Sequence, residues 1–95
     1  MIQAIDKKNI LKFLTNHPSW QIDDQGRFIL SIMNKDYLYL VSELIRIAEL
    51  ADRLDHHPDI TLGWGKLNVF IHTHEIDAIT QRDLDFVQAI DFMVD

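Results

Sequence analysis

The sequence predicts an α+β fold in the order α-β-β-α-β-β-α, with a four-stranded antiparallel sheet and its helices on one face. Three observations indicate this fold. Apolar residues recur at helical spacing in three segments, and strand-like segments occur in two pairs, each joined by a short turn. The third observation is the length, because 95 residues supply one small core and leave no room for a second domain. Residues 1–95 are therefore expected to form a single domain.

The first helix and the first hairpin occupy the first third of the sequence. The helix is predicted to begin after Asp6, a natural N-cap, and to stop before Pro18, which disfavours a helical residue ahead of it. Residues 20–22 and 27–33 are strand-like, and the turn residues 23–26 separate them. We therefore expect a short helix followed by an antiparallel hairpin. The apolar positions of the helix are Ile10, Leu11, Phe13 and Leu14.

A longer helix is predicted from Tyr37, after the N-cap Asp36, to a C-terminus at or near His56. Pro58 closes this segment, because proline disfavours helical backbone in the residue before it. The apolar positions keep a helical period with charged residues between them: Leu40, Val41, Leu44, Ile45, Ala48, Ala51 and Leu54.

The second hairpin is predicted to pair residues 60–64 with residues 67–74 through a tight loop at Gly65-Lys66. Because side chains alternate along a strand, every second residue of 67–74 is expected to face the core. These core positions are Leu67, Val69, Ile71 and Thr73. The positions expected on the open face are Asn68, Phe70, His72 and His74.

The last helix is predicted to start at residues 80–83, where Thr80 and Asp83 have the spacing of a capping box. We interpret Asp83 as a structural carboxylate that satisfies backbone N–H groups at the helix start. The apolar stripe of this helix consists of Leu84, Val87, Ala89, Ile90 and Val94.

Composition excludes several classes of function. Nine Lys and Arg against fifteen Asp and Glu give a net charge of −6, which disfavours direct binding to nucleic acid. The sequence has no cysteine, so it offers no disulfide, thiolate nucleophile or cysteine metal site. No stretch approaches the roughly 20 apolar residues that span a membrane, and the N-terminus lacks a basic start and apolar run. We therefore expect a cytoplasmic protein without membrane contact.

Three histidines form the candidate site. His56 and His57 are adjacent at the end of the second predicted helix, and His74 ends the last predicted strand. Imidazole gives and takes protons near neutral pH, so three converging rings would suit acid/base catalysis. His72 adds an alternative, because a His-x-His pair on a strand can bind zinc, and a small metalloprotein is one reading of this pattern.

Taken together, these residues resemble the pterin-4a-carbinolamine dehydratase family. The resemblance covers nearly the whole chain and includes the order of the helices and strands. It depends on an ordered set of residue types at fixed spacing: Asp52, then His56-His57-Pro58, Trp64, His74 and Asp83. Where His72 stands, members of this family usually carry a small polar residue.

The resemblance implies a hydro-lyase that dehydrates 4a-hydroxytetrahydropterin to quinonoid dihydropterin in tetrahydropterin recycling. Pterin is then the substrate, and neither a metal nor a cofactor is implied. The resemblance also implies a homodimer or homotetramer. The alternative on the same fold is a non-catalytic module that stabilises the assembly or dimerisation of another protein.

Roles within the site follow residue by residue from the resemblance. His56, His57 and His74 are the implied catalytic residues, with His56 and His74 as the acid/base pair and His57 mainly holding the pterin. The implied substrate-binding residues are Asp52, Trp64, Thr73 and Glu75. One turn before His56 on the predicted helix, Asp52 could orient that ring or could simply be a solvated charge. Trp64 could stack on the pterin or could close the core.

Overall fold

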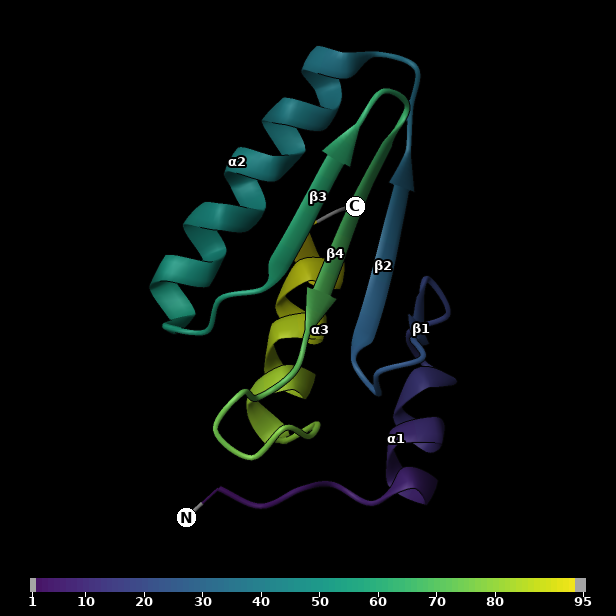
Figure 1. Ribbon diagram of the computed structural model, residues 1–95, viewed down its shortest axis with the longest axis vertical. Coiled ribbons are helices and arrows are strands. Elements are labelled where there is room, and N and C mark those ends of the chain that lie inside the picture. Colours follow the sequence, from purple (N-terminus) through teal and green to yellow (C-terminus); the bar gives the residue numbers. More distant parts are fainter. Residues whose placement is uncertain (1, 94–95) are drawn as a thin grey trace.

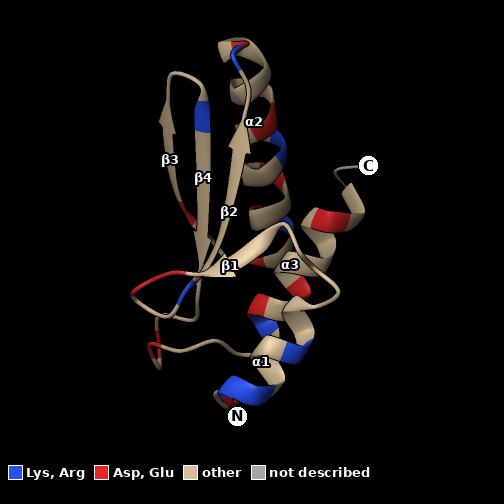
Figure 2. Ribbon diagram, turned by 90° about the vertical axis from the view of Figure 1, so that its right-hand side faces the viewer, with Lys and Arg blue, Asp and Glu red and all other residues tan. Residues whose placement is uncertain are grey.

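The computed structural model describes residues 2–93 as one four-stranded antiparallel sheet with the strand order β1-β2-β4-β3 and three helices (Figure 1). The elements are α1 (Lys7–Leu14), β1 (Trp20–Ile22), β2 (Phe28–Met33), α2 (Tyr37–Leu54), β3 (Asp59–Gly63), β4 (Lys66–Ile71) and α3 (Gln81–Met93). Figure 2 shows the helices on one side of the sheet. The predicted element order and α+β class are confirmed.

Each helix begins where the sequence places a capping residue. The Asp6 side chain accepts a hydrogen bond from Asn9 N at 2.8 Å, and the Asp36 side chain accepts one from Tyr39 N at 3.2 Å. At the start of α3, the backbone N–H of Thr80 donates to the Asp83 carboxylate at 2.8 Å. These contacts satisfy N–H groups that have no partner within the helix, so the predicted helix starts are confirmed.

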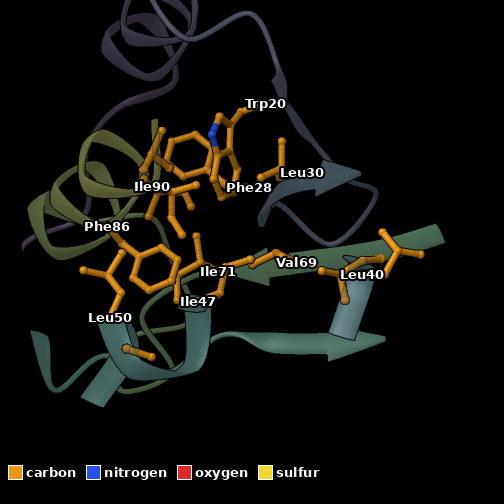
Figure 3. Packing of buried hydrophobic residues seen from close by; sticks show 14 residues of the cluster. Trp20, Phe28, Leu30, Leu40, Ile47, Leu50, Val69, Ile71, Phe86 and Ile90 are labelled. Atoms are coloured by element: carbon orange, nitrogen blue, oxygen red, sulfur yellow. The ribbon is translucent and has the colours of Figure 1, made fainter. Parts of the chain in front are cut away.

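The core lies between the sheet and the helices α2 and α3 (Figure 3). The predicted alternation along β4 is confirmed, because its core positions are buried and the residues between them are partly exposed. Opposite them, both helices turn apolar side chains toward the sheet. The core residues labelled in Figure 3 are Trp20, Phe28, Leu30, Leu40, Ile47, Leu50, Val69, Ile71, Phe86 and Ile90. Val94, which the sequence assigns to the same stripe of α3, lies outside the described residues.

A carboxylate near the end of α3 ties the first hairpin and α1 to the rest of the fold. Asp91 contacts His17 Nδ1 at 2.5 Å with one oxygen and accepts a hydrogen bond from Trp20 Nε1 at 3.0 Å with the other. Phe13 of α1 stacks on the His17 ring. His17 therefore has a structural role in this fold. No helix within residues 2–93 is long and apolar enough to cross a membrane.

Two local predictions about the second hairpin are wrong in detail, and the structure makes the predicted end of the second helix more precise; each difference moves a residue of the candidate site. Helix α2 ends at Leu54, because Asp55 adopts a left-handed conformation with φ 50° and reverses the chain before His56. The tight loop of the second hairpin is Trp64-Gly65, where the left-handed φ of 84° at its second position requires glycine. Strand β4 ends at Ile71, so His74 does not belong to it.

Candidate functional site

The best-defined contact of the site joins two buried side chains. His56 is 6% exposed, and its Nε2 lies 2.6 Å from Oδ1 of Asp83, which is fully buried at the start of α3. The left-handed turn at Asp55 sends the chain away from the helix axis, and Phe86 packs edge-on against the imidazole. The prediction that Asp52 orients His56 is therefore wrong, because Asp83 does so.

Asp83 accepts hydrogen bonds from three directions. Besides His56, it accepts one from Thr73 Oγ1 and one from Thr80 N, both at 2.8 Å. The Thr80 hydroxyl lies 2.7 Å from the Thr73 hydroxyl, whose single hydrogen already points to Asp83, so Thr80 is the donor. With these donors fixed, Asp83 Oδ1 accepts the proton of His56 Nε2. Nδ1 is then the ring nitrogen of His56 that Asp83 does not engage.

This network changes the interpretation of two residues. Asp83 is structural, as predicted, but it also fixes the orientation of an imidazole, which the capping pattern does not reveal. Thr73, assigned to substrate binding by the resemblance, has a fully buried side chain whose hydroxyl is engaged by Asp83 and Thr80. The Thr73 hydroxyl therefore binds Asp83, the partner of His56, and is not free to bind a ligand.

His57 faces the solvent, on the opposite side of the chain from His56. Its Nε2 lies 2.9 Å from Asp52 Oδ1, and the side chains are 60% and 81% exposed. Adjacent residues point in opposite directions in the extended backbone that precedes Pro58, as the sequence predicts. The last turn of α2 thus supplies Asp52 to His57 rather than to His56.

His74 lies in a tight turn that is closed by backbone hydrogen bonds. Thr73 N donates to Ala78 O at 2.9 Å, Ala78 N donates to Thr73 O at 3.3 Å, and Asp77 adopts a positive φ of 51°. The exposed His74 ring lies 4.3 Å from the His72 ring, centroid to centroid. His74 is therefore exposed to the solvent on a turn whose backbone is fixed by hydrogen bonds.

His72 is held between this turn and the sheet. Its Nε2 lies 3.4 Å from Asp77 Oδ1, whereas its Nδ1 is buried and has no hydrogen-bond partner among residues 2–93. The same part of the chain contains no group of three or more His, Asp or Glu side chains placed to hold a metal ion.

The pairing register of the second hairpin brings the histidine-bearing segments side by side. Asp59 of β3 is paired with Phe70 of β4 in an antiparallel ladder. His57 lies two residues before Asp59 and His72 two residues after Phe70, so both segments leave the ladder at the same end. Both His56 and Thr73 contact Asp83, so the two segments also meet on the core side.

An arginine that the sequence reading missed connects the same two segments. Arg82 Nη1 donates to Glu75 Oε2 at 3.0 Å, and Arg82 Nη2 donates to the backbone carbonyl of Asp55 at 3.3 Å. Hydrogen bonds from the Glu75 backbone N–H and from the Arg82 side chain lower the pKa of Glu75, and the charges of Arg82 and His56 lower it further. One guanidinium therefore binds both Glu75 and the residue that precedes His56.

Trp64, a predicted site residue, lies far from the histidines in the structure. It occupies the turn of the β3–β4 hairpin, and its side chain is 76% exposed. His57 and His72 lie beyond the other end of these strands, about seven residues away along the hairpin, which at about 3.3 Å per residue is roughly 20–25 Å. Within one copy of the chain, Trp64 does not join the histidines.

Comparisons with known proteins agree on a single family. The sequence model of the family "Pterin 4 alpha carbinolamine dehydratase" matches residues 3–93. A protein of Thermosynechococcus vestitus is 31% identical over 91 residues, covering 95% of this chain and 94% of its own, and one of Rubrobacter xylanophilus is 32% identical over 74 residues, covering 78% and 69%. Both are provisionally named pterin-4-alpha-carbinolamine dehydratase.

A solved structure shows the same fold. The crystal structure of a transcriptional coactivator/pterin dehydratase from Brucella melitensis superimposes with a TM-score of 0.87, covering 98% of this chain and 100% of that one. The sequence identity is 20%, so this likeness concerns the fold alone.

Proposed function

The chain belongs to the pterin-4a-carbinolamine dehydratase family, and we propose that it dehydrates 4a-hydroxytetrahydropterins to quinonoid dihydropterins by acid/base catalysis from histidine. The observation that carries this proposal is the buried His56–Asp83 pair beside the exposed His57 and the turn that bears His74. One imidazole is fixed in orientation, and the other two are accessible to a ligand.

The reaction needs one proton donor and one proton acceptor. The C4a–O bond breaks as the hydroxyl leaves with an added proton, and the electrons of the N5–H bond form the C4a=N5 double bond. We assign proton donation to His56 Nδ1, because Asp83 engages Nε2, and removal of the N5 proton to His74. Each properly placed group contributes about 10²–10⁴-fold to the rate.

His57 has a different role in this proposal. Asp52 accepts from its Nε2 in an exposed pair, which leaves the rest of the ring free to contact the pterin at the edge of the site. Glu75, next to His74, is charged and exposed and could accept hydrogen bonds from the amino and N–H groups of a pterin.

The test is the rate of dehydration of a freshly generated 4a-hydroxytetrahydropterin, compared with its spontaneous rate. We expect acceleration by the purified protein and a loss of at least about 10²-fold in His74→Ala, with an unchanged folded state. His17→Ala removes an imidazole bound to Asp91 and serves as the matched control, which should retain kcat. A spontaneous rate unaltered by the parent protein would end the proposal and favour the non-catalytic module.

The same proposal includes a place in tetrahydropterin recycling in the cytoplasm and assembly into homodimers or homotetramers. What supports self-association is the exposure of Met33 and Trp64, which line one hollow beside the β3–β4 turn, and of Leu38 in the first turn of α2. Sedimentation at micromolar concentration tests this, and a strictly monomeric protein would contradict it.

A further inference from the structure

Arg82 contacts both chain segments that carry the proposed acid/base pair. Its two terminal nitrogens reach the Glu75 carboxylate and the Asp55 carbonyl. Glu75 directly follows His74, and Asp55 directly precedes His56. One planar side chain therefore links the residues adjacent to the two imidazoles.

Each of these contacts suits its place in the fold. Asp55 is the C-cap of α2, and a carbonyl at a helix C-terminus lacks an intrahelical partner and attracts a cation. On the other side, the Arg82 cation lowers the pKa of Glu75, which keeps the carboxylate charged and attractive to the guanidinium. Both acceptors are fixed to ordered backbone, one at a capped helix end and one in a closed turn.

The backbone of Arg82 is also fixed by a hydrogen bond. Its backbone N–H donates to Thr80 Oγ1 at 3.2 Å within the capped first turn of α3. The next residue, Asp83, binds the His56 ring. The first turn of α3 thus contacts the His56 region twice. Asp83 binds the imidazole, and Arg82 binds the backbone carbonyl of the preceding residue, Asp55.

We infer that Arg82 is a positioning residue that fixes the separation between His56 and His74 by bridging the residues next to them. The inference rests on the proposed function of these two imidazoles. Arg82 needs no contact with the pterin in this role. A fork with two donors is required, because the single ammonium of lysine cannot hold both acceptors in a fixed geometry.

The kinetic test uses Arg82→Gln, Arg82→Lys and, as a matched loss of one exposed positive charge on α1, Lys8→Gln. A displacement of about 1 Å between reacting groups costs on the order of 10²-fold in rate. We expect kcat of Arg82→Gln to fall at least 10-fold, by the scale of that effect, with a smaller change in KM. Arg82→Lys should recover only part of kcat, and Lys8→Gln should match the parent.

A double-mutant cycle tests the path through Glu75. Glu75→Ala removes the acceptor beside His74, so the double variant with Arg82→Gln should lose little more kcat than Arg82→Gln alone. Additive losses, full recovery of kcat by Arg82→Lys, or parental kcat in Arg82→Gln would each overturn the inference.

A second readout does not depend on turnover. In protein labelled with ¹³C at histidine Cε1, nuclear magnetic resonance relaxation reports the order of each ring. We expect the His74 ring to become more mobile in Arg82→Gln and to remain as in the parent in Lys8→Gln. If the parent protein fails to accelerate dehydration, the proposed function is lost, and unchanged ring order in Arg82→Gln separately removes the positioning role.

Discussion

Asp83 Oδ1 lies 2.6 Å from His56 Nε2, across the boundary between the end of α2 and the first turn of α3. Asp83→Asn tests what this contact does. The amide can keep its oxygen toward Thr73 and Thr80 only by turning its NH₂ group toward His56, which then loses its acceptor. The ring is driven to the other tautomer, so we expect kcat to fall about 10²-fold or more.

The same substitution should lower the free energy of unfolding by about 1.5–3 kcal/mol, the contribution of a hydrogen bond to a charged group, because the amide of Asn carries no charge. Asp91→Asn is the matched control, because Asp91 also binds a histidine, His17, at the far end of the same helix. It should lose stability but keep kcat. Urea unfolding and dehydration kinetics separate the two effects, and equal kcat values for Asp83→Asn and the parent would refute the role of Asp83.

Asp52→Asn should have a small effect, because Asp52 contacts the exposed His57 and not His56. An exposed ion pair contributes about 0–1 kcal/mol to folding, so the unfolding midpoint in urea should barely move. In the dehydration assay we expect a change in KM with kcat close to that of the parent. A fall in kcat as large as that of Asp83→Asn would show that Asp52 acts on the chemistry.

The stabilising contribution of Glu75 to folding should be lost in acid. Its pKa in the folded protein is below its ordinary value of 4.5, through hydrogen bonds from its own N–H and from Arg82, so its contribution is present above pH 4.5. That contribution is lost as the pH falls through the folded-state pKa. In Glu75→Gln the free energy of unfolding should differ from the parent at pH 6 and converge with it near pH 3. Parallel pH profiles for the two proteins would contradict this.

Phe86→Leu tests the link between the core and the site. Phe86 is fully buried and packs edge-on against His56, whereas Phe28 is equally buried on β2. Each change to leucine leaves a cavity and should cost about 1–3 kcal/mol. Only Phe86→Leu is expected to lower kcat measured well below the unfolding temperature. Equal kinetics for the two variants would mean that Phe86 does not support His56.

Trp64→Ala should leave kcat and KM within about twofold of the parent, since Trp64 lies roughly 20–25 Å along the hairpin from His57 and His72. Sedimentation of the same variant reports whether the exposed indole contributes to self-association. A large rise in KM would indicate that Trp64 reaches the substrate from a second copy of the chain.

Features with local causes were predictable from the sequence. Asp6, Asp36 and Thr80 cap helices because their side chains accept hydrogen bonds from N–H groups within three residues, and strand alternation placed the core face of β4. The end of α2 was predicted only to within two residues because Asp55, and not glycine, adopts the left-handed conformation. A left-handed residue other than glycine has no recognisable signal in the sequence.

The partners of the two adjacent histidines could not be read from spacing. Helical periodicity pairs Asp52 with His56, but that reasoning fails once the helix ends before His56. The true partner, Asp83, is far along the chain and was recognised only as a cap. Arg82 was missed for the same reason, because its two contacts are set by how α3 meets α2 and the turn beyond β4.

The strand order has a consequence for how the chain folds. The two central strands, β2 and β4, come from different hairpins and are separated along the chain by α2 and β3. Their pairing must close a long loop before any of the contacts between the hairpins form, which slows folding relative to a sheet of local pairs. Cutting the chain between β2 and α2 should therefore leave two fragments that are each unstructured alone. Because His56 meets Asp83 only where the paired hairpins are covered by α3, mixing the fragments should restore dehydratase activity and secondary structure together.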